Sequence, residues 1–260
     1  MLNVPKFLRS SLAISALLFS APALWAAALA PLEITDQHRQ VTASVVQQLS
    51  EHHYRDQSLN DDLSSEYLDN YLKTLDPTKS YFFQADIDGF NRHREKFDNW
   101  LAKGNLNEAF DIFDIYRQRL TTRLESVIER LESDEIKYDF TTDDQLVVDW
   151  EQAEWPEDKK TADELWHRRV KASLLDLVLA GKDLEESKEL LRKRYENQLR
   201  RVRQQDSDDA FEVVINSLTT LYDPHTNYLS PRTLENFNIN MSLSLEGIGA
   251  VLQTEDEHTK

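Results

Sequence analysis

Glycine is scarce in this sequence, because only five glycines occur among its 260 residues. Average chains contain about 7% glycine, and glycine is the default residue of tight turns, hairpins and phosphate-cradling loops. The shortage disfavours a fold rich in such loops and predicts a chain that is mainly helical. At about 150 residues per domain, the length fits roughly one or two domains with a real hydrophobic core.

Charge and cysteine content exclude several classes of protein. The chain has no cysteine, so it forms no disulfide and has no thiolate metal ligand or cysteine nucleophile. It has 47 acidic and 30 basic side chains, a net charge of −17. Nucleic-acid binding depends on clustered Lys and Arg, so we expect no nucleic-acid partner. The negative charge also repels anionic membranes and favours dispersal in solution.

The N-terminus has the pattern of an export signal. Lys6 and Arg9 precede an apolar run from Leu12 to Leu29, which contains several alanines suited to signal peptidase. This order is typical of a secretory signal peptide. An uncleaved membrane anchor is the alternative, but Pro22 interrupts the run. We therefore predict a signal peptide over residues 1–28, cleavage after Ala28, and an exported product with no stable membrane insertion. No cysteine follows the apolar run, which excludes a lipid anchor through a lipobox.

Helical spacing of apolar residues extends from Thr35 to about Tyr222. Gly104 and Gly181 each follow an apolar stripe, where a helix commonly ends in a left-handed residue. Thr161, with an acidic residue three positions later, and Ser207 are predicted to cap two later helices. The spacing thus predicts a multi-helix domain over residues 29–240.

Two segments of this helical region stand apart. Residues 133–160 lose the periodicity and are rich in Asp and Glu, so we interpret them as a long loop held by Trp150 and Trp155. The helix expected after Gly181 has a basic face between Arg192 and Arg203. Such a face is usually solvated, although on an acidic protein it could pair with an acidic helix of the same chain.

A short pattern occurs twice, as D-P-x-x-x-Y at residues 76–81 and 223–228. We interpret both copies as a reused helix–turn–helix connector, because proline cannot continue a helix and Asp can close a turn. Asp223 and His225 could in principle bind a metal, but no third ligand stands at a fixed spacing. Beyond the turns, apolar residues match in offset: Ile87 and Phe90 in the first copy, Leu234 and Phe237 in the second.

The period changes to that of a strand at residue 241. Apolar residues alternate with polar ones, the apolar set being Met241, Leu243 and Leu245. Unpaired strand edges are prone to aggregation, so a β-containing domain is expected to follow. We predict that residues 241–260 open this domain and that the sequence is a truncated part of a longer protein.

A glycine corner follows the first expected strand, at Gly247, Ile248, Gly249 and Ala250. Backbone N–H groups around such glycines can form a nest that binds the C-terminal carboxylate of a peptide, while the next strand pairs with that peptide. A glycine bulge at a strand corner is the structural alternative. Spacing alone leaves both open.

Catalytic motifs with known spacing are absent from the sequence. It has no G-x-S-x-G, H-E-x-x-H, Walker or dinucleotide-binding motif, and no S-x-x-K. We therefore name no catalytic residue, metal ligand or cofactor in this chain.

Residues 221–253 closely resemble the region leading into the PDZ domain of tail-specific proteases, the periplasmic C-terminal processing peptidases of Gram-negative bacteria. The specific runs are D-P-H-T-x-Y-L-S-P from Asp223 and G-I-G-A from Gly247. The HHYR run at residues 52–55 and the tryptophan spacing from Trp155 to Trp166 are similar to the N-terminal helical region of that family.

The resemblance implies a serine endopeptidase that recognises apolar C-terminal tails through a PDZ domain and cuts with a Ser-Lys dyad. Both catalytic residues would lie beyond residue 260, and residues 247–250 would begin the peptide site. It also implies a periplasmic location, protein substrates with apolar C-termini and a helical-repeat lipoprotein adaptor as partner. The alternatives are a complete, non-enzymatic helical binding or adaptor protein, and a metal-dependent hydrolase using Asp223 and His225.

Overall fold

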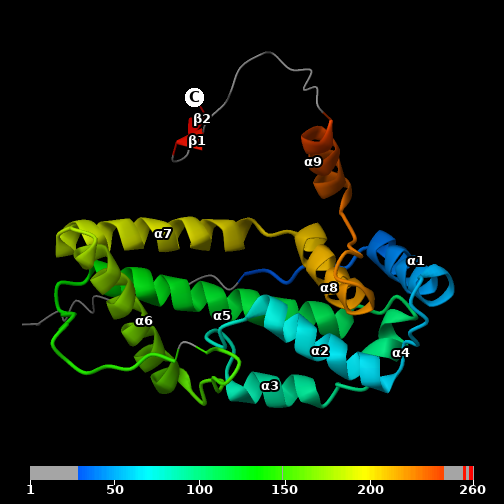
Figure 1. Cartoon of the computed structure of the whole chain (residues 1–260), viewed down its shortest axis with the longest axis horizontal. Helices are drawn as coiled ribbons and strands as arrows, with labels where there is room; N and C mark the ends of the chain where they lie inside the picture. Colours follow the sequence, from blue (N-terminus) through cyan, green and yellow to red (C-terminus); the bar gives the residue numbers. More distant parts are fainter. Residues whose placement is uncertain (1–28, 148, 243–253, 256–257, 260) are drawn as a thin grey trace, which may run out of the picture.

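The computed structural model describes residues 29–147, 149–242, 254–255 and 258–259, and within them the protein is mainly α-helical, as predicted (Figure 1). None of the helices described is both long and apolar enough to span a bilayer. The helices are α1 (Asp36–His52), α2 (Asp61–Leu75), α3 (Gln84–Asn91), α4 (Phe97–Leu101), α5 (Asn107–Glu132), α6 (Lys159–Leu179), α7 (Leu184–Gln204), α8 (Ser207–Tyr222) and α9 (Pro231–Met241). Strands β1 (Thr254–Glu255) and β2 (His258–Thr259) form an antiparallel pair.

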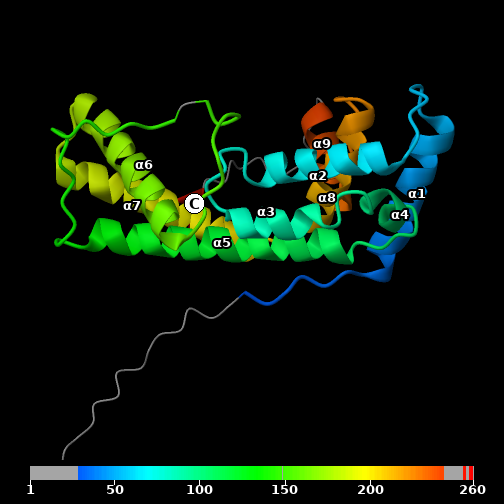
Figure 2. The same ribbon diagram turned by 90° about the horizontal axis from the view of Figure 1, so that it is seen from below.

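Helix α5 runs the length of the helical body, and α7 lies alongside it (Figures 1 and 2). Helix α6 packs against α7 at one end of the body, and α2 packs against α8 at the other. The apolar residues of α5 recur every three or four positions over its 26 residues, which gives it one continuous buried face.

The buried apolar residues form two clusters that both include α5. The first lies between α1, α2, α3, α4, α8 and the N-terminal half of α5, with Tyr71, Phe113 and Phe211 almost fully buried. The second lies between α6, α7 and the C-terminal half of α5, around Leu124 and Leu174. Burying one such side chain stabilises the fold by about 1.5–3 kcal/mol, so α5 contributes stability to both ends of the body.

The two predicted N-caps are wrong by one to three residues. Asp158 caps α6, and its carboxylate accepts a hydrogen bond from the N–H of Thr161 at 2.8 Å. Asp206 caps α8 in the same way, so Ser207 is the first residue inside that helix. An Asp at the N-cap both accepts this bond and faces the positive end of the helix dipole. In runs with several capping residues, spacing alone does not show which one is used.

Gly104 and Gly181 have positive φ angles, of 66° and 95°, as expected after a helix. A Cβ on Gly104 would lie 2.4 Å from the carbonyl oxygen of Arg39, whereas a Cβ on Gly181 would meet no atom within 4 Å. The close approach of the Arg39 backbone therefore requires glycine at position 104. At position 181, only the positive φ angle favours glycine.

Gly104→Ala is expected to lower the free energy of unfolding by about 2 kcal/mol or more, because it combines left-handed strain with a backbone clash. Gly181→Ala is the matched control and should cost only about 1 kcal/mol, the strain alone. Urea unfolding followed by far-ultraviolet circular dichroism measures both. Equal losses would contradict the close approach of Gly104 to Arg39.

The segment between α5 and α6 is the long loop that the sequence predicted, and tryptophans do hold it. Trp155 packs edge-on against Phe82 with ring centroids 5.9 Å apart, and the guanidinium of Arg169 lies 4.2 Å from the centre of the Trp150 ring. Lys171, which is buried, also binds Asp144 at 2.5 Å. The acidic loop is thereby attached to α6.

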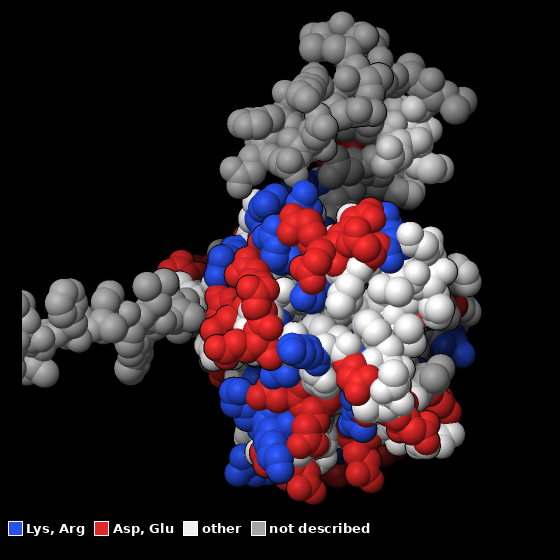
Figure 3. All heavy atoms as spheres, turned by 90° about the vertical axis from the view of Figure 1, so that its left-hand side faces the viewer, with Lys and Arg blue, Asp and Glu red and all other residues white. Residues whose placement is uncertain are grey.

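The basic face of α7 is partly paired with α5. Arg203 contacts Glu125 at 2.6 Å, and Arg192 lies 3.8 Å from Glu132. Arg192 also pairs with carboxylates of its own helix. Pairing within the chain, the alternative raised from the sequence, is thus confirmed for these two arginines. Figure 3 shows both signs of charge interspersed on the end of the body near the α6–α7 connection.

The repeated D-P-x-x-x-Y pattern forms the same helix–turn–helix twice, as predicted. Asp76 and Asp223 end α2 and α8, and the carbonyl of each accepts a hydrogen bond from the N–H three residues later. The N-cap position of the next helix is Phe83 in the first copy and Ser230 in the second, at the same offset from the Asp. The two units are therefore α2–α3 and α8–α9.

Helix α9 ends one residue beyond the predicted helical domain and corrects the predicted start of the strand pattern. Met241 belongs to α9, and the N–H of Ser242 donates to the carbonyl of Asn238. Ser230 as N-cap followed by Pro231 as first helical residue is a strong helix start. Residues 243–253, where most of the alternating pattern falls, lie outside the described residues.

Candidate functional site

The predicted peptide-binding residues Gly247, Ile248, Gly249 and Ala250 lie outside the described residues, so their role stays a prediction. The structure does describe the segments that lead to them. Residues 52–55 begin at the last residue of α1, and residues 222–226 begin at the last residue of α8 and enter the turn that leads to α9. These segments, the HHYR and YDPHT runs, contact each other, and we call their contact the motif junction.

Three side chains from residues 53–55 make the motif junction. The hydroxyl of Tyr54 donates to Oδ2 of Asp223 at 2.5 Å. Arg55 Nη1 donates to the carbonyl of Tyr222 at 2.6 Å. The ring of His53 lies 3.2 Å from Oγ1 of Thr226. The arginine thus satisfies a carbonyl at the end of α8, one of the groups that a helix terminus leaves without an internal partner.

Hydrogen bonds hold Asp223 in its ionised form. The Tyr54 hydroxyl, and then the N–H of His225 at 2.8 Å, lower the pKa of Asp223 to about 2. The same contact raises the pKa of Tyr54, so the phenol remains a proton donor at neutral pH. The junction is therefore a charge-assisted clasp between α1 and the α8–α9 turn.

A metal site at Asp223 and His225 gains no support from the geometry. Across the described parts of the chain, no three His, Cys, Asp or Glu side chains gather as metal ligands. Asp223 instead accepts hydrogen bonds from Tyr54 and from the N–H of His225. The turn interpretation of this motif is thus the one that the contacts favour.

Tyr54→Phe is expected to raise the pKa of Asp223 from about 2 toward the ordinary value of 3.8, because it removes the largest cause of the shift. A carboxylate with a depressed pKa contributes stability above its unfolded pKa and loses it as the pH falls. The clasp should therefore weaken between about pH 4 and pH 2. Carbon-13 NMR titration of the Asp223 carboxyl measures the change. An unchanged pKa in the variant would contradict the Tyr54–Asp223 contact.

An apolar groove lies beside the motif junction. It has a volume of about 600 Å³ and is lined on one side by α1, including Val41, Val45 and Leu49, and on the other by the turn, including Tyr228. Its apolar walls suit an aliphatic or aromatic side chain.

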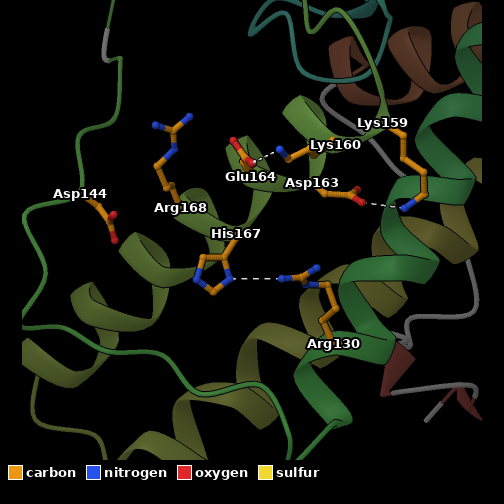
Figure 4. Close-up of a pocket in the computed structure, with 8 residues that line it drawn as sticks. All are labelled: Arg130, Asp144, Lys159, Lys160, Asp163, Glu164, His167 and Arg168. Carbon is orange, nitrogen blue, oxygen red and sulfur yellow. Dashed lines mark hydrogen bonds and ion pairs between the residues drawn. The ribbon is translucent and has the colours of Figure 1, made fainter.

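A second pocket, of about 730 Å³, is lined by charged residues of α5, α6 and the loop between them (Figure 4). Arg130 and His167 point toward each other, with Nη2 and Nδ1 3.3 Å apart. Burial and the nearby Arg130 lower the pKa of His167, which favours the neutral ring. Asp163 pairs with Lys159 at 2.6 Å. None of the described residues that line it is a serine, threonine or cysteine.

Sequence reasoning missed the contact between Tyr54 and Asp223. The two residues are 169 positions apart, and no local periodicity links them. Their only sequence signal is that each lies in one of the two runs quoted for the family resemblance. That signal marks both residues but does not show that they meet.

Comparison with known proteins gives a consistent result. The family model described as "Tail specific protease N-terminal domain" matches residues 45–232. The chain is 37% identical over 225 residues to the tail-specific protease of Haemophilus influenzae, an alignment that covers 86% of this chain and 32% of that protein. The chain thus spans about a third of the length of this curated relative.

Proposed function

This chain belongs to the tail-specific protease family, and from that premise we propose that it is the N-terminal part of a periplasmic serine endopeptidase that processes proteins at apolar C-terminal tails. The observation that supports the proposal most is the family match over residues 45–232, which includes both segments of the motif junction. The helical body would form the scaffold, and the catalytic part would follow it in the chain.

The proposed chemistry uses residues beyond this chain. A desolvated, neutral lysine would act as general base for a serine hydroxyl. Within this chain, the backbone N–H groups of Gly247, Ile248, Gly249 and Ala250 would donate hydrogen bonds to the carboxylate of the substrate tail. Residues 1–28 would direct export to the periplasm and be removed. A helical-repeat lipoprotein adaptor is the proposed additional partner.

Peptidase assays on the full-length protein test this proposal. One peptide ending in a free apolar residue is compared with the same peptide amidated at its C-terminus and with one ending in Asp. We expect kcat/KM to fall at least about tenfold for both altered peptides, since the carboxylate and the apolar side chain each contribute more than about 1.4 kcal/mol. Equal cleavage of all three would contradict tail recognition.

The 260-residue chain itself is the matched control in these assays. We expect it to cleave none of the peptides, because no catalytic residue is assigned within it. Turnover by this chain would overturn the placement of the Ser-Lys dyad. A lack of activity in the full-length protein as well would favour the non-enzymatic binding or adaptor protein. N-terminal sequencing of the exported protein tests the predicted signal peptide. The expected first residue is Leu29.

A further inference from the structure

Helix α9 presents an apolar surface that the described part of the chain does not cover. None of its residues is buried, and Figure 1 shows it projecting from the helical body. Its first turn is attached to α8, where Thr233 Oγ1 donates to Glu212 at 2.8 Å and Arg232 pairs with Asp209. The exposed apolar residues that follow are Leu234 (45%), Phe237 (50%), Ile239 (41%) and Met241 (66%).

The first copy of the helix–turn–helix shows what such a helix normally contacts. Ile87 and Phe90 of α3 occupy the offsets of Leu234 and Phe237, and they are only 6% and 4% exposed. Helix α3 is covered by α5 and by the long loop: Arg119 of α5 pairs with Asp86 at 2.9 Å, and Pro156 accepts a hydrogen bond from the N–H of Gln84. Helix α9 therefore has the apolar pattern of a core helix, but the described residues do not cover it in the same way.

The chemistry of this surface defines its partner. Leu234, Phe237 and Met241 are three and four positions apart, so they lie on one face of α9. No charged residue occurs between Asn236 and Ser242, in a chain in which 30% of residues are charged. The surface therefore fits an apolar, uncharged face of another folded unit.

We propose that α9 docks onto the folded part of the same polypeptide that follows it in the full-length protease. This inference rests on the proposed function. The chain spans 32% of its curated relative and matches a model of an N-terminal domain, so most of such a protein follows α9. A unit joined to α9 by a short linker would have an effective concentration in the millimolar range, and a small apolar contact would then suffice.

A second copy of this chain is a poorer fit to the same surface. Helix α9 has 11 residues and is thus about 16 Å long. One face of such a helix offers a few hundred Å² at most, whereas stable association of two proteins buries about 800 Å² on each partner. The intramolecular partner avoids this requirement.

Docking of α9 would also couple the following unit to the motif junction, because the junction holds the turn that begins seven residues before α9's N-cap.

Hydrogen–deuterium exchange with mass spectrometry tests the docking in two intact proteins, the 260-residue chain and the full-length protease. We expect the amides of α9 to exchange at least about tenfold more slowly in the full-length protein. In that protein, the double variant Leu234→Asp with Phe237→Asp should restore the fast exchange. Leu179→Asp with Leu190→Asp is the matched control, because both leucines are also exposed, at 76% and 38%, and it should leave α9 protected.

Three outcomes would overturn the docking proposal. Equal exchange of α9 in both proteins would show that nothing after it covers the helix. Protection that rises with concentration in the 260-residue chain would assign the surface to a second copy. A protein that has no folded part after residue 260 would remove the partner. The peptide assays are separate, so protected α9 without peptidase activity would reject the proposed function while leaving the docking in place.

Discussion

Asp76→Ala is expected to lower the free energy of unfolding by about 3 kcal/mol or more. Asp76 is 1% exposed, and its carboxylate accepts hydrogen bonds from the N–H groups of Ser80, Tyr81 and Phe82 at 2.9, 2.7 and 3.1 Å. Removal of the carboxylate leaves several buried donors without a partner, and each such group costs about 1–3 kcal/mol. Urea unfolding by circular dichroism and by tryptophan fluorescence measures the loss.

Asp223→Ala is the matched control, because Asp223 occupies the same position in the second copy. Its carboxylate accepts only one backbone N–H within the turn, that of His225, and the turn lies at the surface. The expected loss of stability is much smaller than for Asp76→Ala. Similar losses in the two variants would show that the backbone bonds of Asp76 do not hold the first turn together.

Phe90→Ala is expected to lower the free energy of unfolding by about 3–5 kcal/mol, the usual range for removing a buried phenylalanine. The ring of Phe90 is 4% exposed and packs against Phe82, with centroids 5.5 Å apart. Its removal would leave a cavity in the first apolar cluster. Thermal and urea unfolding of the 260-residue chain measure the effect.

Phe237→Ala changes the same residue type at the matching offset of the second copy. In the 260-residue chain we expect a change of about 0.5 kcal/mol or less, as for most surface substitutions, because Phe237 is 50% exposed. In the full-length protein the proposed docking of α9 should make the loss larger. A large loss already in the 260-residue chain would contradict the exposure of this helix.

Local patterns predicted the features that local physics determines. The helical class, the long loop predicted at residues 133–160 and the two helix–turn–helix units follow from periodicity, proline and glycine, which act within a few residues. Gly181 shows this well. Its N–H donates to the carbonyl of Val178, and the N–H of Lys182 donates to the carbonyl of Leu177. These two bonds make a complete C-terminal capping motif.

Features that depend on distant contacts could not be predicted. The offsets of Phe90 and Phe237 are the same, yet one ring is buried and the other exposed, because α5 and the long loop cover α3 but not α9. Likewise, nothing in the spacing of Tyr54 shows that it meets Asp223. The N-caps at Asp158 and Asp206 were missed because each stands in a run with other capping residues. The glycine corner at 247–250 remains a prediction.

Helix α5 contributes to both apolar clusters along its 26 residues, and this limits how the body can be divided. A boundary placed anywhere within α5 would remove one wall from each core, so neither piece would retain enough buried surface to fold alone. Melting at one end exposes apolar surface of the helix that supports the other. The helical body should therefore unfold in a single transition, and shortened versions of the protein should keep residues 107–132 whole.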